Sequence, residues 1–199
     1  LSFLIVLIGP FIIFTEVYDF YEIFNRSHPY WASFIKFAIL ATIGELIGQR
    51  IRSGYYYHKG FGIIPRAIVW GFLGIMIKMA FVIFGSGAPQ MLASMGVQYP
   101  GDVAADILKS SILESRSWLH FWSALAVSTT LNLFFAPVFM TFHKITDEHI
   151  RKTGGTLKGF FSPIQFGEIM ISLNWKVMWN FVYKKTIPLF WIPMQTITF

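Results

Sequence analysis

Cysteine is absent from this chain of 199 residues, and charged residues are scarce. Without a thiol the chain forms no disulfide, thiolate metal site or iron–sulfur cluster, and it has no cysteine nucleophile. Charged residues make up 13% of the sequence, whereas an ordinary soluble domain carries roughly 25%. Hydrophobic residues make up 55%. This composition predicts a single membrane domain over residues 1–199, and it leaves the redox compartment open.

Catalytic and cofactor motifs are also missing from the sequence. No GxSxG, Walker A, HExxH or dinucleotide fingerprint occurs. His143, Asp147 and His149 come closest to a metal cluster, but only His143 and Asp147 have the i, i+4 spacing of one helix face. His120 and His143 lie at opposite ends of one apolar run and cannot hold one haem between them. We therefore expect a protein that is not an enzyme and that has no metal or other cofactor.

Charge alternates along the chain in step with the apolar runs. Residues 15–30 are acidic and residues 50–60 are basic, and then residues 87–116 are acidic and residues 144–185 are basic. This is the positive-inside pattern of a chain that crosses a bilayer several times. It places both basic segments on the cytoplasmic or matrix side. Anionic lipid headgroups, and not nucleic acid, then explain the net charge of +6.

The apolar runs predict an all-α, polytopic integral membrane bundle with four spans and a partial one. We expect spans at 31–49, 61–86 and 117–143, and a last span that begins within 186–199. Residues 1–14 are apolar but too short for a complete span, which needs about 20 residues. They predict the visible end of an extra N-terminal helix.

Three segments between the spans predict other structures. Residues 101–115 have the amphipathic spacing of a helix on the membrane surface. Residues 160–183 are apolar with polar interruptions, which favours one or two interfacial helices, with a further span as the alternative. The charge pattern favours the interfacial interpretation, because a span there would put Lys184 and Lys185 on the acidic side. Residues 87–100 contain two prolines and predict a loop.

Ionisable side chains inside the predicted spans are candidates for function, because burying a charge in a bilayer costs a few kcal/mol. They are Lys36, Glu45, Arg66 and Lys78. Glu45 and Arg66 lie at similar depth, about 6–8 Å from the basic ends of two antiparallel neighbouring spans. This placement predicts a Glu45–Arg66 ion pair, which serves conduction or only locks two helices together. Lys36 is expected to reach the interface, and Lys78 to line a polar cavity or meet an acid.

Other polar and small residues complete the candidate set. Inside a bilayer, hydroxyl and amide groups near the middle of a span need hydrogen-bond partners. Together with the ionisable residues they predict a narrow water-containing path. The candidate polar residues are Thr42, Glu45, Gln49, Arg66, Lys78, Thr129 and Asn132. Gly44 and Gly48 form a small-xxx-small pair, which predicts close approach of a neighbouring helix.

Four short motifs follow one another along the chain. They are Gly44-Glu45 with Gln49, Arg66 with Gly71, Asn132 with Ala136-Pro137, and Trp191 with Pro193, Gln195 and Phe199. In this order they resemble the Gly-acid-x-x-x-Gln, Arg-x-x-x-x-Gly, Gln-x-x-x-Ala-Pro and Trp-Pro-x-x-Gln motifs of the Mpv-seventeen and small peroxisomal membrane protein family. The resemblance covers residues 29–199, so residues 1–14 are either extra to the family core or its first helix.

The resemblance implies a four-helix integral membrane protein that acts as a pore or metabolite route. It favours the mitochondrial inner membrane, with a peroxisomal or bacterial inner membrane as alternatives. The sequence departs from the family pattern at Leu131, where an acid is usual, and at Thr198, where an asparagine is usual. The missing acid at Leu131 means that the resemblance does not carry cation selectivity over to this chain.

Two functions follow as expectations. The first is a small channel or metabolite pore in an energised membrane, which needs a continuous polar path. The second is a non-catalytic accessory subunit of a larger membrane complex, supported by the many aromatic residues at lipid depth. The expected partners are the lipid bilayer, anionic lipid headgroups, and either other membrane subunits or further copies of the chain.

Overall fold

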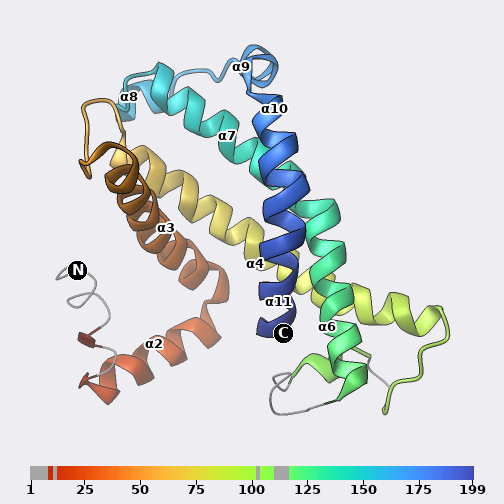
Figure 1. Ribbon diagram of the computed structural model, residues 1–199. Coiled ribbons are helices and arrows are strands. Elements are labelled where there is room, and N and C mark those ends of the chain that lie inside the picture. Colours follow the sequence, from red (N-terminus) through yellow and green to blue (C-terminus); the bar gives the residue numbers. More distant parts are fainter. Residues whose placement is uncertain (1–8, 11–12, 102–103, 110–116) are drawn as a thin grey trace. The chain divides into compact units, whose positions relative to one another are not determined.

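The computed structural model describes residues 9–10, 13–101, 104–109 and 117–199, which are helical with no strand among them (Figure 1). They form two compact units. The first comprises Leu1–His58 and Arg66–Lys78, and the second comprises Lys59–Pro65 and Met79–Phe199. The predicted N-terminal helix at 1–14 lies almost entirely outside the described residues. Of the predicted surface helix at 101–115, the described part includes a short 3-10 helix, η1 (Ala104–Leu108).

The first unit contains α2 (Thr15–Ser27), α3 (Pro29–Ser53) and the middle of α4 (Ile63–Ser94). Pro29 occupies the first turn of α3, where its missing N–H would have no helical partner and its fixed φ suits the helix. Gly54 ends α3 in the left-handed conformation, with φ 81°, which glycine adopts without steric cost. The predicted span at 31–49 therefore lies within a longer helix.

α4 is longer than the sequence pattern predicts. Its 32 residues continue to Ser94 and include Pro89, so the loop predicted at 87–100 begins only at Met95. The prediction was wrong over the first part of that segment. One proline removes a single helical hydrogen bond, whereas unwinding the helix in lipid would leave several backbone groups unsatisfied.

The second unit contains a long helical run formed by α6 (Trp118–Thr130), η2 (Leu131–Phe135) and α7 (Ala136–Lys152). η2 is a π-helical turn that directly precedes Pro137. Because a proline disturbs the hydrogen bonds of the turn before it, a local widening of the helix at this point has an identifiable cause. The run contains the predicted span at 117–143 and continues through the polar residues that follow it.

The C-terminal part of the second unit begins with two short helices, α8 (Leu157–Phe160) and α9 (Phe166–Ser172). A continuous helical run follows, made of α10 (Trp175–Val177), η3 (Met178–Trp191) and α11 (Ile192–Thr198).

We predicted a break between interfacial helices ending at 183 and a span starting at 186, and this boundary was wrong. The break lies at Asn174, whose side chain accepts a hydrogen bond from the Val177 backbone N–H at 3.0 Å and so starts the helix. Only α9 is a separate short helix in the segment predicted to be interfacial. Lys184 and Lys185 lie inside the C-terminal helical run and are exposed.

A glycine contact joins the segment before α4 to the end of α7 within the second unit. Gly155 has a φ of 68°, and a Cβ built on it would lie 2.5 Å from the Gly60 carbonyl oxygen and 2.7 Å from the Gly62 nitrogen. No side chain fits there without backbone movement, so glycine at 155 allows the two backbones to touch.

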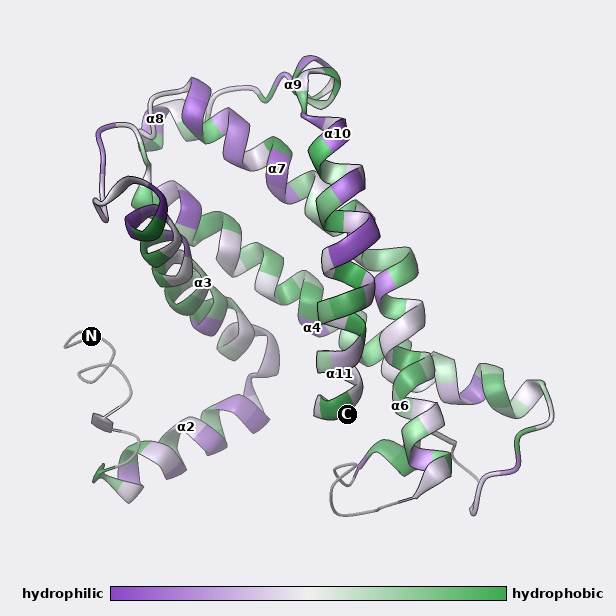
Figure 2. Ribbon diagram, viewed as in Figure 1, coloured by the Kyte–Doolittle hydropathy of each residue, from purple (hydrophilic) through white to green (hydrophobic). Residues whose placement is uncertain are grey.

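Three helical runs among the described residues are long and apolar enough to cross a membrane. They are Pro29–Ser53, Ile63–Ser94 and Trp118–Lys152. They correspond to three of the four predicted spans, and Figure 2 shows that α4 is almost entirely hydrophobic, whereas α2 and α7 carry many hydrophilic residues. The protein is thus all-helical with the character of an integral membrane protein. The C-terminal run is not among these three.

Candidate polar sites in the spanning helices

The predicted Glu45–Arg66 ion pair is present in the first unit. The Arg66 Nη1 group donates to Glu45 Oε2 at 2.6 Å, and the Trp70 indole N–H donates to Glu45 Oε1 at 2.9 Å. The Glu45 and Arg66 side chains are 18% and 13% exposed, respectively. Arg66 and Trp70 are four residues apart on α4, so both face α3. The carboxylate uses both oxygens, which fixes the register between the two helices.

The close approach of α3 and α4 occurs at glycines other than the predicted pair. A Cβ built at Gly71 would lie 2.5 Å from the Phe34 ring, and one at Gly74 would lie 2.7 Å from the Ser33 carbonyl oxygen. A Cβ at Gly44 or Gly48 meets nothing within 4 Å among the described residues of the same unit. The Gly44/Gly48 pair therefore does not mediate the contact between α3 and α4, and its packing against another helix stays a prediction, because sequence spacing does not reveal which side of α3 faces α4.

The other polar residues predicted in the first unit make no hydrogen bond to the ion pair within the part of the chain that the structure describes. Thr42 is buried, and its hydroxyl has no hydrogen-bond partner among the described residues. Gln49 donates from Nε2 to Ser53 Oγ at 3.2 Å, one turn along α3. Lys78 is half-buried on α4. None of these contacts links the three residues into a path.

Lys36 has two partners that the sequence did not predict. Its Nζ donates to Asn25 Oδ1 at 3.1 Å and lies 5.7 Å from the centre of the Tyr21 ring. Both partners belong to α2, so a cation–π contact and a hydrogen bond tie α2 to α3.

A row of polar contacts joins the α6–η2–α7 run to the C-terminal run, and we call it the polar seam. Asn132 Nδ2 donates to Gln195 Oε1 at 2.5 Å and to the Ser128 carbonyl oxygen at 2.8 Å. Ser128 Oγ donates to the Ile192 carbonyl oxygen at 2.8 Å. Asn132 is 2% exposed. The predicted polar residue Asn132 thus meets Gln195, which the sequence marked only through a family motif.

The polar seam extends toward both ends of the helix pair. His120 Nε2 lies 3.0 Å from the Phe199 carbonyl oxygen, and Thr141 Oγ1 lies 2.7 Å from the Tyr183 hydroxyl. His120 is fully buried, and its Nδ1 has no hydrogen-bond partner among the described residues. Residues early in one run therefore meet residues late in the other, and the two runs are antiparallel.

Sequence reasoning missed His120, Ser128 and Tyr183 as seam residues. Ser128 and Asn132 are four residues apart, and His120 lies eight residues before Ser128, so one helix face carries all three. That spacing was the signal in the sequence that could have marked His120 and Ser128 as neighbours of Asn132. Tyr183 had none, because its contact depends on the register of the C-terminal run.

The remaining motif residues of the second unit have simple surroundings. Thr129 is half-buried. Trp191 is 42% exposed, and Pro193 is also exposed. The Pro137 carbonyl oxygen accepts a hydrogen bond from Thr141 Oγ1 at 2.8 Å. The same oxygen accepts a hydrogen bond from the Tyr183 hydroxyl at 3.4 Å, so the Pro137 backbone belongs to the polar seam.

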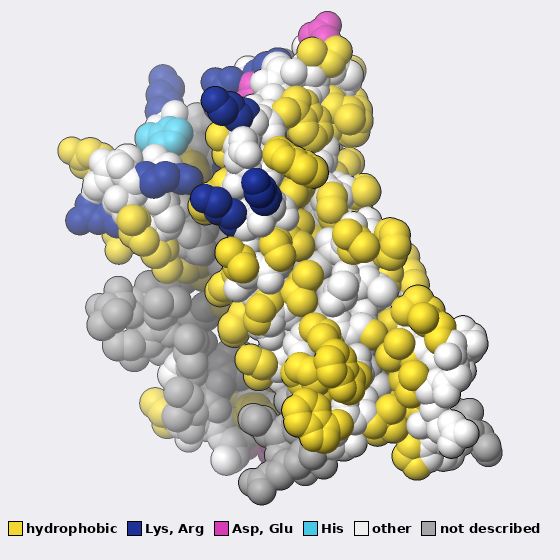
Figure 3. All heavy atoms as spheres, turned by 45° about the vertical axis from the view of Figure 1, so that its right-hand side comes forward, with side chains coloured by type: hydrophobic (Ala, Val, Ile, Leu, Met, Phe, Trp, Pro, Cys, Tyr) yellow, Lys and Arg dark blue, Asp and Glu magenta, His cyan; other side chains and the backbone are white. Residues whose placement is uncertain are grey.

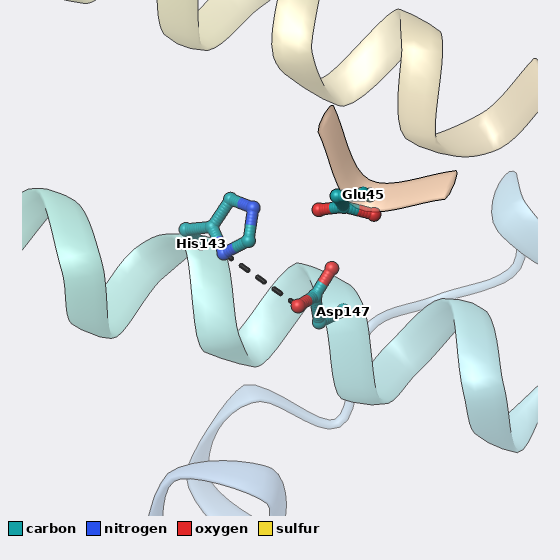
Figure 4. A group of neighbouring side chains, drawn as sticks. All are labelled: Glu45, His143 and Asp147. Carbon is teal, nitrogen blue, oxygen red and sulfur yellow. Dashed lines mark ion pairs between the residues drawn. The ribbon is translucent and has the colours of Figure 1, made fainter. Parts of the chain in front are cut away.

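His143 and Asp147 share one face of α7, as their spacing predicts (Figure 4). His143 Nδ1 lies 3.6 Å from Asp147 Oδ2, and Lys144 Nζ also lies 3.6 Å from Asp147 Oδ2. His149 faces elsewhere, and its Nε2 lies 3.1 Å from the Phe160 carbonyl oxygen. The three residues that come closest to a metal cluster in sequence therefore do not converge.

The residues predicted to line one path are divided between the two units. Thr42, Glu45, Gln49, Arg66 and Lys78 belong to the first, and Thr129 and Asn132 belong to the second. Comparisons with protein-family models, with curated proteins and with solved structures match nothing.

Proposed function

We propose that this chain is a small integral membrane protein that forms a narrow channel or metabolite pore. The observation that carries the proposal is the polar seam, in which Asn132 donates to Gln195 and Ser128 donates to the Ile192 carbonyl oxygen between two helical runs. A polar residue at membrane depth is rare and is usually retained for solute passage or a relay. A row of polar groups also offers a solute hydrogen-bond partners along the helices, in place of those that it has in water.

Four spanning helices are part of this proposal. The C-terminal run, residues 175–198, is at most about 36 Å long at the α-helical rise, because the 14 residues of η3 are wound as a π-helix. It is antiparallel to the α6–η2–α7 run, so it is suited to return across a core of about 30 Å. In this topology residues 50–60 and 144–174 lie on one side of the membrane, and Lys176, Lys184 and Lys185 lie in the part of the run nearest that side, in agreement with the positive-inside rule.

Membership of the Mpv-seventeen and small peroxisomal membrane protein family belongs to the same proposal. It is supported by the motifs around Glu45, Arg66 and Asn132, each of which makes a hydrogen bond in the structure. The mitochondrial inner membrane is the favoured location, with a peroxisomal or bacterial inner membrane as alternatives. Homo-oligomers or other membrane subunits are the expected partners.

A non-catalytic accessory subunit is the second candidate. The specific observation in its favour is that Glu45 and Asn132 already have hydrogen-bond partners within their own units. Contacts of this kind also arise where polar residues only hold helices together.

Reconstitution in liposomes tests the channel directly. Purified protein should release entrapped ions or small solutes, and Asn132→Leu should lower the rate several-fold because it removes the amide from the polar seam. Leu133→Ala is the matched control, because Leu133 is the next residue and is 63% exposed. Vesicles that retain every ion and small solute would contradict the channel. Co-purification of the chain within a larger particle would then favour the accessory subunit.

A further inference from the structure

Three lysines on the C-terminal run have no acidic partner. Lys176, Lys184 and Lys185 are exposed, and none of them makes an ion pair within 4.0 Å in the part of the chain that the structure describes. The run contains no Asp or Glu. By contrast, Lys144 lies 3.6 Å from Asp147. These three lysines therefore present uncompensated positive charge to their surroundings.

The antiparallel pairing of the two helical runs sets the depth of these charges. The Tyr183 hydroxyl lies 2.7 Å from Thr141 Oγ1, so the backbone of Lys184 and Lys185 lies within about one side-chain length of the level of Thr141. Thr141 is about 34 Å along the run from Trp118, which is slightly more than the hydrocarbon thickness of about 30 Å. Trp118 is 76% exposed, as suits an aromatic anchor at one interface. The ammonium groups of Lys184 and Lys185 then reach the headgroup level of the opposite interface along their flexible stems.

Neighbouring side chains have the character of a headgroup site. Lys176, Asn180 and Lys184 follow one another at intervals of four residues, which places them along one face, and Asn180 Nδ2 donates to the Lys176 carbonyl oxygen at 3.0 Å. Trp175 and Trp179 are 39% and 63% exposed, and tryptophan favours the membrane interface. In Figure 3, Lys and Arg side chains lie beside hydrophobic side chains on the face on view.

We propose that Lys176, Lys184 and Lys185 bind the phosphate group of an acidic phospholipid in the leaflet on the basic side. Lysine ammonium groups bind phosphate as point charges, and anionic headgroups attract clustered basic residues beside a membrane helix. Farther along the run, Leu189 and Phe190 are 75% and 51% exposed. Exposed apolar side chains next to the cations suit the acyl chains of the same lipid, which a free phosphate lacks. This site does not depend on whether the protein conducts a solute.

Native mass spectrometry of the full chain, released from nanodiscs of phosphatidylcholine and phosphatidylglycerol, tests the proposal. The wild type should retain phosphatidylglycerol in preference to phosphatidylcholine. The variant Lys176→Gln/Lys184→Gln/Lys185→Gln should lose about fivefold in this preference for each lysine removed. The matched control removes equal charge from other exposed basic positions; its substitutions are Arg52→Gln, Lys152→Gln and Lys158→Gln. It should retain most of the preference.

Several outcomes would overturn the proposal. One is a wild type without preference for phosphatidylglycerol, and another is an equal loss in the control variant, which would indicate diffuse attraction by net charge. Displacement of the lipid by millimolar inorganic phosphate would show that a free phosphate occupies the site. The Lys→Arg triple variant keeps the charge and should keep the preference. Unchanged helical circular dichroism would separate lipid loss from unfolding.

Discussion

Glu45 uses both of its carboxylate oxygens, one for Arg66 and one for Trp70. Asn132 similarly uses its amide for a side chain and a backbone carbonyl at once. In lipid, no water replaces a missing hydrogen bond, so each unsatisfied polar group costs several kcal/mol. At the scale of residues, this cost explains why both groups point toward a neighbouring helical segment of their own unit.

Replacing only one member of the ion pair should destabilise the protein. Glu45→Leu removes the carboxylate that accepts from Arg66 and Trp70, and we expect a loss of about 3 kcal/mol in the free energy of unfolding. Glu45→Leu with Arg66→Met removes both charges and should recover most of that loss, although the Trp70 hydrogen bond to Glu45 is still missing. Denaturant titration in detergent micelles measures both variants. Equal losses in the single and the double variant would show that the charges do not interact.

The ion pair was predictable because it depends only on the depth of two residues in consecutive antiparallel spans. Glu45 and Arg66 lie similar distances from the turn that joins their helices, so an error of one residue changes the depth by only about 1.5 Å. The partners of Asn132 were not predictable in this way. Gln195 lies far along the chain, and its position depends on the register of the C-terminal run.

At the scale of elements, the helices continue through signals that usually end a helix. α4 contains Pro89, and η3 contains Pro188. Composition located the apolar runs correctly but placed several ends too early, because a bilayer favours a continuous helix over a loop with free backbone groups. The π-helical turn before Pro137 shows how a helix adapts without unwinding.

Glycine substitutions should separate the packed face of these helices from the unpacked one. Gly74→Ala would bring a Cβ to 2.7 Å from the Ser33 carbonyl oxygen, and we expect it to cost about 1–3 kcal/mol. Gly44→Ala is the control, and it should be neutral or should stabilise the helix by about 0.5–1 kcal/mol. Thermal unfolding followed by circular dichroism measures both. A larger loss for Gly44→Ala would mean that another helix packs on that face.

At the scale of the whole molecule, charge alternation and long apolar helices determine the membrane character. Three helical runs among the described residues have the length and hydropathy to span a bilayer. The C-terminal run carries two adjacent lysines and differs from these three runs in composition. Whether it crosses the bilayer therefore decides between three spans and four.

The absence of cysteine makes the proposed topology easy to test. Single cysteines can replace Ser53, Ser94, Thr156 and Thr198, all of which are exposed. In sealed vesicles of one orientation, an impermeant thiol reagent should label positions 53 and 156 together, and positions 94 and 198 only after the vesicles are opened, or the reverse. This result is expected because the positive-inside rule puts both basic segments on one side. Labelling of position 198 together with position 156 would contradict the fourth span.

The sequence by itself determined the membrane environment, the helical class, three apolar spans and the depth of Glu45 and Arg66. These properties depend on composition, charge pattern and distance along one chain segment, which are local quantities. Only the tertiary structure decided which glycines meet a neighbouring helix, where the C-terminal run begins and which residues form the polar seam. Those features depend on helix rotation and register, which are set by packing between residues far apart in the chain. The missing cysteines excluded thiol chemistry, and the contacts around Glu45 and Asn132 show which other side chains make the buried polar contacts.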